Sequence, residues 1–154
     1  MKTFLEIMIN SKTEMRSFGV FLAKTLNGGD VVTLNGSVGV GKTFLCKAII
    51  NKITKIKEIP SPTFSLLQTY KDKNFIINHY DFYRLENSDE LIELDYGNSI
   101  STGICIIEWA NKFPMALPNN RIEINIDLIN KDKRSLNFIF FGNTAKKELE
   151  WCQE

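Results

Sequence analysis

The sequence carries no strong excess of either charge. Its 19 lysines and arginines nearly balance its 18 aspartates and glutamates, which leaves a formal net charge of +1. Proteins that attract nucleic acids or membrane surfaces through their overall field have a marked basic excess. The composition therefore argues against attraction of nucleic acids or membranes by the overall charge. A local basic patch is compatible with the composition.

Cysteine is scarce and poorly spaced for cross-linking. Cys46, Cys105 and Cys152 are far apart, odd in number and outside any CxxC pair. This spacing favours free thiols in a reducing compartment over a disulfide framework or a zinc site. No apolar stretch approaches the ~20 residues of a membrane span, and the first residues lack a signal-peptide pattern. We therefore expect a cytoplasmic protein with no membrane association.

Internal repeats, low-complexity tracts and Pro- or Ser-rich linkers are missing as well. The chain has 154 residues, of which 44% are hydrophobic. That length and composition suffice for one hydrophobic core without disulfides or metals as staples. The sequence predicts a single domain over residues 1–154.

Apolar residues at helical spacing predict four helices, over residues 11–27, 43–53, 88–94 and 144–151. Ser11 or Thr13 is expected to cap the first of them, and Glu14 completes a capping-box pattern with Ser11. Ser88 is expected to cap the short acidic helix.

Alternating patterns and short apolar runs predict strands over residues 3–9, 30–35, 64–70, 75–80, 103–107, 121–129 and 135–141. The run at 103–107 is apolar throughout, which is typical of a strand covered on both faces. The last two strands alternate and are separated by a polar turn. Together these features predict an α/β sheet with a parallel core and antiparallel strands at an edge.

One motif carries specific chemistry. The pattern G-x-x-x-x-G-K-[ST] is matched at every fixed position by Gly36, Ser37, Val38, Gly39, Val40, Gly41, Lys42 and Thr43. Glycines let backbone N–H groups turn towards phosphate oxygens, and the following helix directs its positive end at the same anion. Lys42 adds a cation for the β and γ phosphates, and the Thr43 hydroxyl is a ligand for Mg²⁺. The alternative, a loop that only joins a strand to a helix, has no use for Lys42 and Thr43.

Two carboxylates are candidates for steadying that Mg²⁺. Glu108 follows the apolar run 104–107, and Asp81 follows the expected strand 75–80. Each would stand at the carboxyl end of a strand beside the loop, where one would hold the metal and the other would orient water. The residues leave this division of roles open, and either carboxylate could instead cap a turn. His79, the only histidine, is expected to be hydrogen-bonded and structural.

Thr63 lies between the helix that follows the motif and the next expected strand. Many P-loop GTPases place a switch threonine in that interval, where its hydroxyl senses the γ phosphate. The equally weighted alternative is a proline turn that begins a strand.

Four segments in this order resemble one family: residues 36–43, SPTF at 61–64, HYDFYRL at 79–85 and IEW at 107–109. The chain resembles the TsaE (YjeE) family of small bacterial ATPases of tRNA threonylcarbamoyladenosine synthesis, over nearly its whole length. The resemblance implies a P-loop NTPase fold, with a mainly parallel central sheet, flanking antiparallel strands and helices on both faces.

The resemblance also implies a function. A member of this family binds ATP with Mg²⁺, hydrolyses it slowly and joins the TsaB–TsaD complex. That complex transfers a threonylcarbamoyl group to an adenosine of tRNAs that read codons starting with A. The ATPase does not carry out the transfer itself but supports repeated turnover. The implied partners are TsaD and TsaB, with tRNA as an indirect partner through the complex.

Site residues follow by motif match. The resemblance implies that Thr43 and Glu108 bind Mg²⁺, and that Lys42, Thr63, Asp81 and Glu108 serve hydrolysis or nucleotide sensing. It implies that the nucleotide contacts Ser11, Gly36, Ser37, Val38, Gly39, Val40, Gly41, Lys42, Thr43, Phe44 and Arg134. Trp109 is a further candidate, although a tryptophan after a strand is more often packed. Arg134 follows a charged turn, and such turns are usually just solvated.

The chain departs from the family at two points. Ser37 stands where an acidic residue is common, and Ala110 stands where a proline is common. The backbone phosphate cradle does not depend on either position.

Two other functions are compatible with the motif. A small P-loop kinase usually needs an arginine-rich lid, whereas the four arginines here are scattered. An ATP-dependent binding switch would need no essential hydrolysis. The sequence has no Asn-Lys-x-Asp element for guanine, so the preference for ATP over GTP rests on the resemblance.

Overall fold

The computed structural model describes residues 2–60 and 65–143. Thr63 and the helix expected over residues 144–151 lie outside this part of the chain. Seven strands form one sheet in the order β1-β7-β6-β2-β5-β4-β3. They are β1 (Lys2–Ile9), β2 (Val31–Asn35), β3 (Leu67–Lys71), β4 (Ile76–Asp81), β5 (Ile104–Glu108), β6 (Arg121–Leu128) and β7 (Arg134–Phe141).

The centre of the sheet is parallel, as predicted. Strands β4, β5, β2 and β6 all run in one direction. Strand β3 is antiparallel to β4, while β7 is antiparallel to both β6 and β1. Antiparallel strands therefore flank the parallel centre at both edges.

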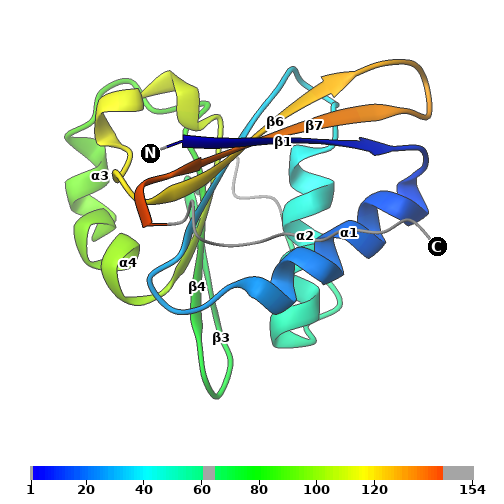
Figure 1. Ribbon diagram of the computed structural model, residues 1–154. Coiled ribbons are helices and arrows are strands. Elements are labelled where there is room, and N and C mark those ends of the chain that lie inside the picture. The colour runs from blue at the N-terminus through cyan, green and yellow to red at the C-terminus, as the bar shows by residue number, and fades with distance from the viewer. Residues whose placement is uncertain (1, 61–64, 144–154) are drawn as a thin grey trace.

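Helices cover the sheet from two sides. They are α1 (Lys12–Thr25), α2 (Lys42–Thr54), α3 (Glu90–Glu93) and α4 (Tyr96–Thr102), with 3-10 turns η1 (Ala110–Lys112) and η2 (Pro114–Ala116). Figure 1 shows α1 and α2 on one side of the strands and α3 and α4 on the other. In the described residues no helix has the length and apolarity needed to cross a membrane.

Two apolar cores account for these layers. The first packs Phe18 and Leu22 of α1 with Leu45 of α2 against the sheet. The second gathers aromatic and aliphatic side chains around Tyr80 and Tyr96 on the opposite face. Strand β5 contributes alternate residues to both cores, which confirms the prediction that it is covered on both faces. Each fully buried aliphatic side chain contributes roughly 1.5–3 kcal/mol to folding.

Helices α1 and α2 approach closely at Gly19. A Cβ atom added there would lie 2.6 Å from Cβ of Ala48, so glycine is needed for this packing. Ser11 caps α1 as expected, because its Oγ accepts the N–H of Glu14 at 3.1 Å. The Glu14 carboxylate in turn accepts the N–H of Asn10.

Two local expectations were wrong, and one helix was missed. The short acidic helix begins at Glu90 with Asp89 as its N-cap, so Ser88 does not cap it. Helix α4 was not foreseen, because its sequence YGNSIST has weak helix formers and no apolar period. Strand β3 begins at Leu67 rather than at residue 64. Leu66 before it has a positive φ of 64°, which breaks the strand there.

Candidate functional site

The loop between β2 and α2, residues 36–41, is built on three glycines with positive φ. Their φ values are 152° at Gly36, 77° at Gly39 and 118° at Gly41. A Cβ at Gly36 would lie 2.7 Å from the Ile126 carbonyl oxygen and 2.8 Å from Cγ1 of Val40. The strand–loop–helix order predicted for the motif is present, and this glycine loop stands at the positive end of α2.

Lys42 begins α2 and turns back over the glycine loop. Its Nζ donates to the carbonyl oxygens of Gly36 at 2.5 Å and Ser37 at 2.8 Å. Only 5% of this residue is exposed. Burial lowers the pKa of Lys42, and the negative charges of Glu108 and Asp81 act in the opposite direction. Its Nζ also lies 4.1 Å from the ring centroid of Trp109, within the range of a cation–π contact.

Thr43, Glu108 and His79 form a buried chain of contacts. Parallel pairing sets Glu108 of β5 beside Leu34 of β2, next to the glycine loop. Oγ1 of Thr43 donates to Oε1 of Glu108 at 2.7 Å, and Nε2 of His79 lies 2.7 Å from Oε2 of the same carboxylate. The predicted position of Glu108 is therefore confirmed. His79 is hydrogen-bonded as expected, and its partner is Glu108.

Asp81 ends β4 directly opposite Glu108 in the sheet register. Its Oδ1 accepts the N–H of Tyr83 at 2.9 Å, so it caps the turn that follows the strand. It is 4% exposed and also lines the cavity beside the glycine loop. The turn cap expected as one alternative is therefore present, and a role of this carboxylate in the site stays a prediction.

A cavity of about 640 Å³ opens over the glycine loop. At one end it is bounded by the start of α1 and the turn between β6 and β7, and at the other by Asp81, Glu108 and Trp109. The nucleotide-contact residues predicted from the resemblance that line it are Ser11, Val38, Gly39, Val40, Gly41, Lys42, Thr43, Phe44 and Arg134. Gly36 and Ser37 do not line it but present their carbonyl groups to Lys42.

Arg134 joins the hairpin to the glycine loop. Its Nε donates to the carbonyl oxygen of Val40 at 2.9 Å, and its Nη1 donates to that of Asn130 at 3.0 Å. This side chain therefore holds the β6–β7 turn against the glycine loop. The alternative interpretation, a solvated arginine, does not describe it. Ser11 lies at the same end of the cavity, and its hydroxyl serves as the α1 cap.

Trp109 closes the opposite end. It adopts a left-handed conformation with φ of 56°, which is rare for a bulky residue and turns the chain sharply after Glu108. The backbone N–H of Trp109 donates to the Leu34 carbonyl oxygen at 2.9 Å. The Tyr83 ring packs against the Trp109 ring at a centroid distance of 5.0 Å. Tyr83, outside the predicted set of site residues, also lines the cavity, and its place two residues after Asp81 is the signal in the sequence.

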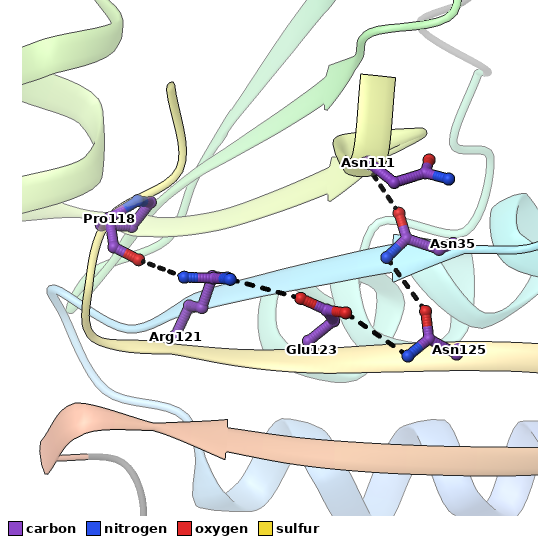
Figure 2. A network of polar contacts seen from close by, with 6 residues as sticks. All are labelled: Asn35, Asn111, Pro118, Arg121, Glu123 and Asn125. Carbon is purple, nitrogen blue, oxygen red and sulfur yellow. Dashed lines mark hydrogen bonds and ion pairs between the residues drawn. The ribbon is translucent and has the colours of Figure 1, made fainter. Parts of the chain in front are cut away.

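A polar network behind the loop was also missed. Figure 2 shows Asn35, the last residue of β2, between the amide of Asn125 and the backbone of Asn111. Nδ2 of Asn35 donates to Oδ1 of Asn125 at 3.1 Å, and its Oδ1 accepts the N–H of Asn111 at 2.9 Å. The network continues through Glu123 to Arg121. Asn35 thus ties the start of the glycine loop to the chain two residues after Trp109.

The site combines a helix start, a buried ammonium group, a hydroxyl and two carboxylates around one cavity. A helix start beside a buried cation favours an anionic ligand. A hydroxyl next to a carboxylate offers the oxygen ligands that Mg²⁺ prefers.

Comparisons with known proteins agree with the motifs. The family model of TsaE, "Threonylcarbamoyl adenosine biosynthesis protein TsaE", matches residues 9–136. The tRNA threonylcarbamoyladenosine biosynthesis protein TsaE of Rickettsia bellii (strain RML369-C) is 41% identical over 133 residues, which cover 86% of this chain and 92% of that protein. The protein of the same name from Bacillus subtilis (strain 168) is 32% identical over 133 residues, covering 84% and 82%.

A solved structure shows the same architecture. The crystal structure of YdiB from Bacillus subtilis matches with a TM-score of 0.76 at 29% sequence identity. The match covers 93% of this chain and 89% of that one. The likeness therefore extends across the sheet and the helices on both of its sides.

Proposed function

The chain belongs to the TsaE family, and from that premise we propose that it is a Mg²⁺-dependent P-loop ATPase of tRNA threonylcarbamoyladenosine biosynthesis. It would act in the cytoplasm with TsaB and TsaD, which carry out the transfer to tRNA. The observation that carries the proposal is the meeting of Lys42, Thr43 and Glu108 at one cavity over the glycine loop.

The cavity suits the phosphates of ATP. Its volume of about 640 Å³ lies within the usual range of ligand pockets, roughly 300–1,000 Å³. The positive φ values of Gly39 and Gly41 bend the backbone at the start of α2, where N–H groups and the helix dipole favour phosphate. Lys42 supplies a positive charge, and this side chain is already buried away from solvent. Ser11 and Arg134 lie at the end of the cavity proposed for the base and sugar.

The residues around Thr43 suit Mg²⁺. The Thr43 hydroxyl and the Glu108 carboxylate are hard oxygen donors at 2.7 Å from each other, so both are in reach of one ion. When bound, Mg²⁺ neutralises charge on the phosphates as the terminal bond breaks. His79 holds the second oxygen of Glu108 and so sets the orientation of this carboxylate.

Asp81 is the proposed group that orients the attacking water. It lines the same cavity as Glu108, one strand further from the glycine loop, and its Oδ1 is fixed by the N–H of Tyr83. Trp109 covers Lys42 and limits the access of bulk water to the phosphate end.

Phosphate release tests this function. It should be measured from ATP and GTP with Mg²⁺, for the chain alone and with purified TsaB and TsaD. Lys42→Ala and Glu108→Gln should abolish release, whereas their matched controls Lys47→Ala and Glu93→Gln, both exposed, should retain it. Slow ATP-selective release that rises with the partners supports the proposal. Release that ignores the partners or prefers GTP would contradict the assignment to this pathway.

A further inference from the structure

A second group of side chains with metal-ligand chemistry shares Glu108 with the proposed Mg²⁺ site. Cys46 of α2, His79 of β4 and Glu108 of β5 each offer one ligand atom, and these atoms all lie within 4.8 Å of one another. Their exposed fractions are 0%, 0% and 1%. The spacing of the cysteines in the sequence does not predict a metal site. The fold brings the Cys46 thiol close to a histidine and a carboxylate.

The donor set differs in chemistry from the one proposed for Mg²⁺. Thiolate sulfur and imidazole nitrogen suit borderline ions such as Zn²⁺ and Co²⁺, whereas Mg²⁺ binds oxygen almost exclusively. Zinc bonds of about 2.0–2.3 Å place tetrahedral ligand atoms roughly 3.5 Å apart. Because the ligand atoms lie within 4.8 Å of one another, the widest pair needs to close by at most about 1.3 Å, and a water molecule can fill the fourth position.

One polar atom in this group is unsatisfied. Nδ1 of His79 is buried and has no hydrogen-bond partner within residues 2–60 and 65–143. Buried polar groups in this condition are uncommon and are often explained by an ion or a water molecule.

The group can be reached by an ion. Binding of a divalent ion displaces the thiol proton of Cys46 to solvent. Glu108 and Thr43 line the open cavity, so an ion has a path to the group from the nucleotide side.

We propose that Cys46, His79 and Glu108 form an inhibitory site for a borderline transition-metal ion such as Zn²⁺. Coordination at this site draws Glu108 away from Thr43, and the proposed Mg²⁺ site loses its carboxylate. The binding of the ion stands on the geometry of the three side chains alone. The inhibition rests on the proposed ATPase function.

Co²⁺ titration of the full-length chain without nucleotide tests the binding. A Cys152→Ser background removes the thiol outside the described residues. The expected signal is the near-ultraviolet charge-transfer absorption of a cobalt–thiolate bond with intense visible bands. It should vanish in Cys46→Ser and persist in Cys105→Ser, the matched control, whose thiol lies in the core on the opposite face of the sheet. A signal that is missing from the parent, or that survives Cys46→Ser, would overturn the site whatever the ATPase assay shows.

Zn²⁺ inhibition of phosphate release tests the consequence. Cys46→Ser keeps Thr43, His79 and Glu108, so its activity with Mg²⁺ should match that of the parent. The Zn²⁺ concentration for half-inhibition should rise at least about tenfold, because the loss of even an outer-shell partner of a metal ligand lowers affinity by about 10–100-fold. Equal sensitivity of Cys46→Ser and the parent would overturn the inhibitory role, even where the cobalt signal establishes the site.

Discussion

The buried pair of His79 and Glu108 can be broken one partner at a time. Their side chains are 0% and 2% exposed, and their contact is 2.7 Å. Replacing His79 by Leu leaves the Glu108 carboxylate with one donor, the Thr43 hydroxyl, among the contacts described above. Leaving a buried polar group without its hydrogen-bond partner costs about 1–3 kcal/mol. For a domain of this size, that corresponds to a fall in Tm of about 2–12 °C.

The double variant isolates the interaction free energy of His79 with Glu108 from the contacts that each residue makes elsewhere. His79→Leu combined with Glu108→Leu leaves neither member of the pair without the other, because both polar groups are gone. The loss for the double variant should therefore be smaller than the sum of the two single losses by about 1–3 kcal/mol. The Thr43 hydroxyl loses its acceptor in both variants that lack Glu108, so that effect cancels in the cycle.

Urea unfolding followed by circular dichroism measures all four free energies. His79→Gln serves as a further control, because its amide retains an N–H donor and should lose less stability than His79→Leu. Additive losses within about 0.5 kcal/mol would show that the two residues do not interact, which would refute the proposed orientation of Glu108 by His79.

Three further predictions concern the frame of the site. Gly36→Ala should lower Tm and weaken ATP binding, because φ of Gly36 is 152° and the new Cβ would lie 2.7 Å from a backbone oxygen. The control in thermal unfolding is Gly97→Ala, where a new Cβ would meet no described atom within 4 Å. Asn35→Ala should cost about 1–3 kcal/mol and speed amide exchange at Asn111, whose N–H loses its acceptor; unchanged exchange would contradict this role. Burial raises the pKa of Tyr80 to about 12, so the free energy of unfolding should hold up to about pH 10, the unfolded pKa, and fall as the pH rises towards 12. Tyr80→Phe should flatten that fall in alkaline urea titrations.

Local signals predicted the centre of the site. The glycine loop, Lys42 and Thr43 follow from fixed spacing within eight consecutive positions. The structure sets the loop between β2 and α2, and Lys42 and Thr43 begin that helix. Glu108 was predicted because an apolar run marks the end of a covered strand, and parallel pairing then brings that end to the loop.

Contacts between distant segments could not be predicted in this way. Asn35 meets Asn111 and Asn125 only because β2 lies between β5 and β6, and nothing in the local pattern specifies that strand order. The contact of His79 with Glu108 depends on the register of β4 against β5. A shift of one residue would send each side chain to the other face of the sheet.

Short helices were the weakest part of the prediction. Helix α4 packs Tyr96 into the second core, although its residues have low helix propensity. It begins after Asp95, which has a positive φ of 54°. Tertiary packing therefore stabilises this helix. Hydrophobic periodicity and helix propensity do not report such packing.

The central claim is that the cavity over the glycine loop binds Mg²⁺-ATP through Lys42. Calorimetric titration of ATP with Mg²⁺ into the parent, Lys42→Ala and Lys47→Ala tests it most directly. The account predicts one ATP for each chain in the parent and in Lys47→Ala, with an affinity at least about tenfold lower in Lys42→Ala, because a charge-assisted hydrogen bond contributes about 1.5–3 kcal/mol. No binding by the parent, or equal affinity in Lys42→Ala, would contradict it.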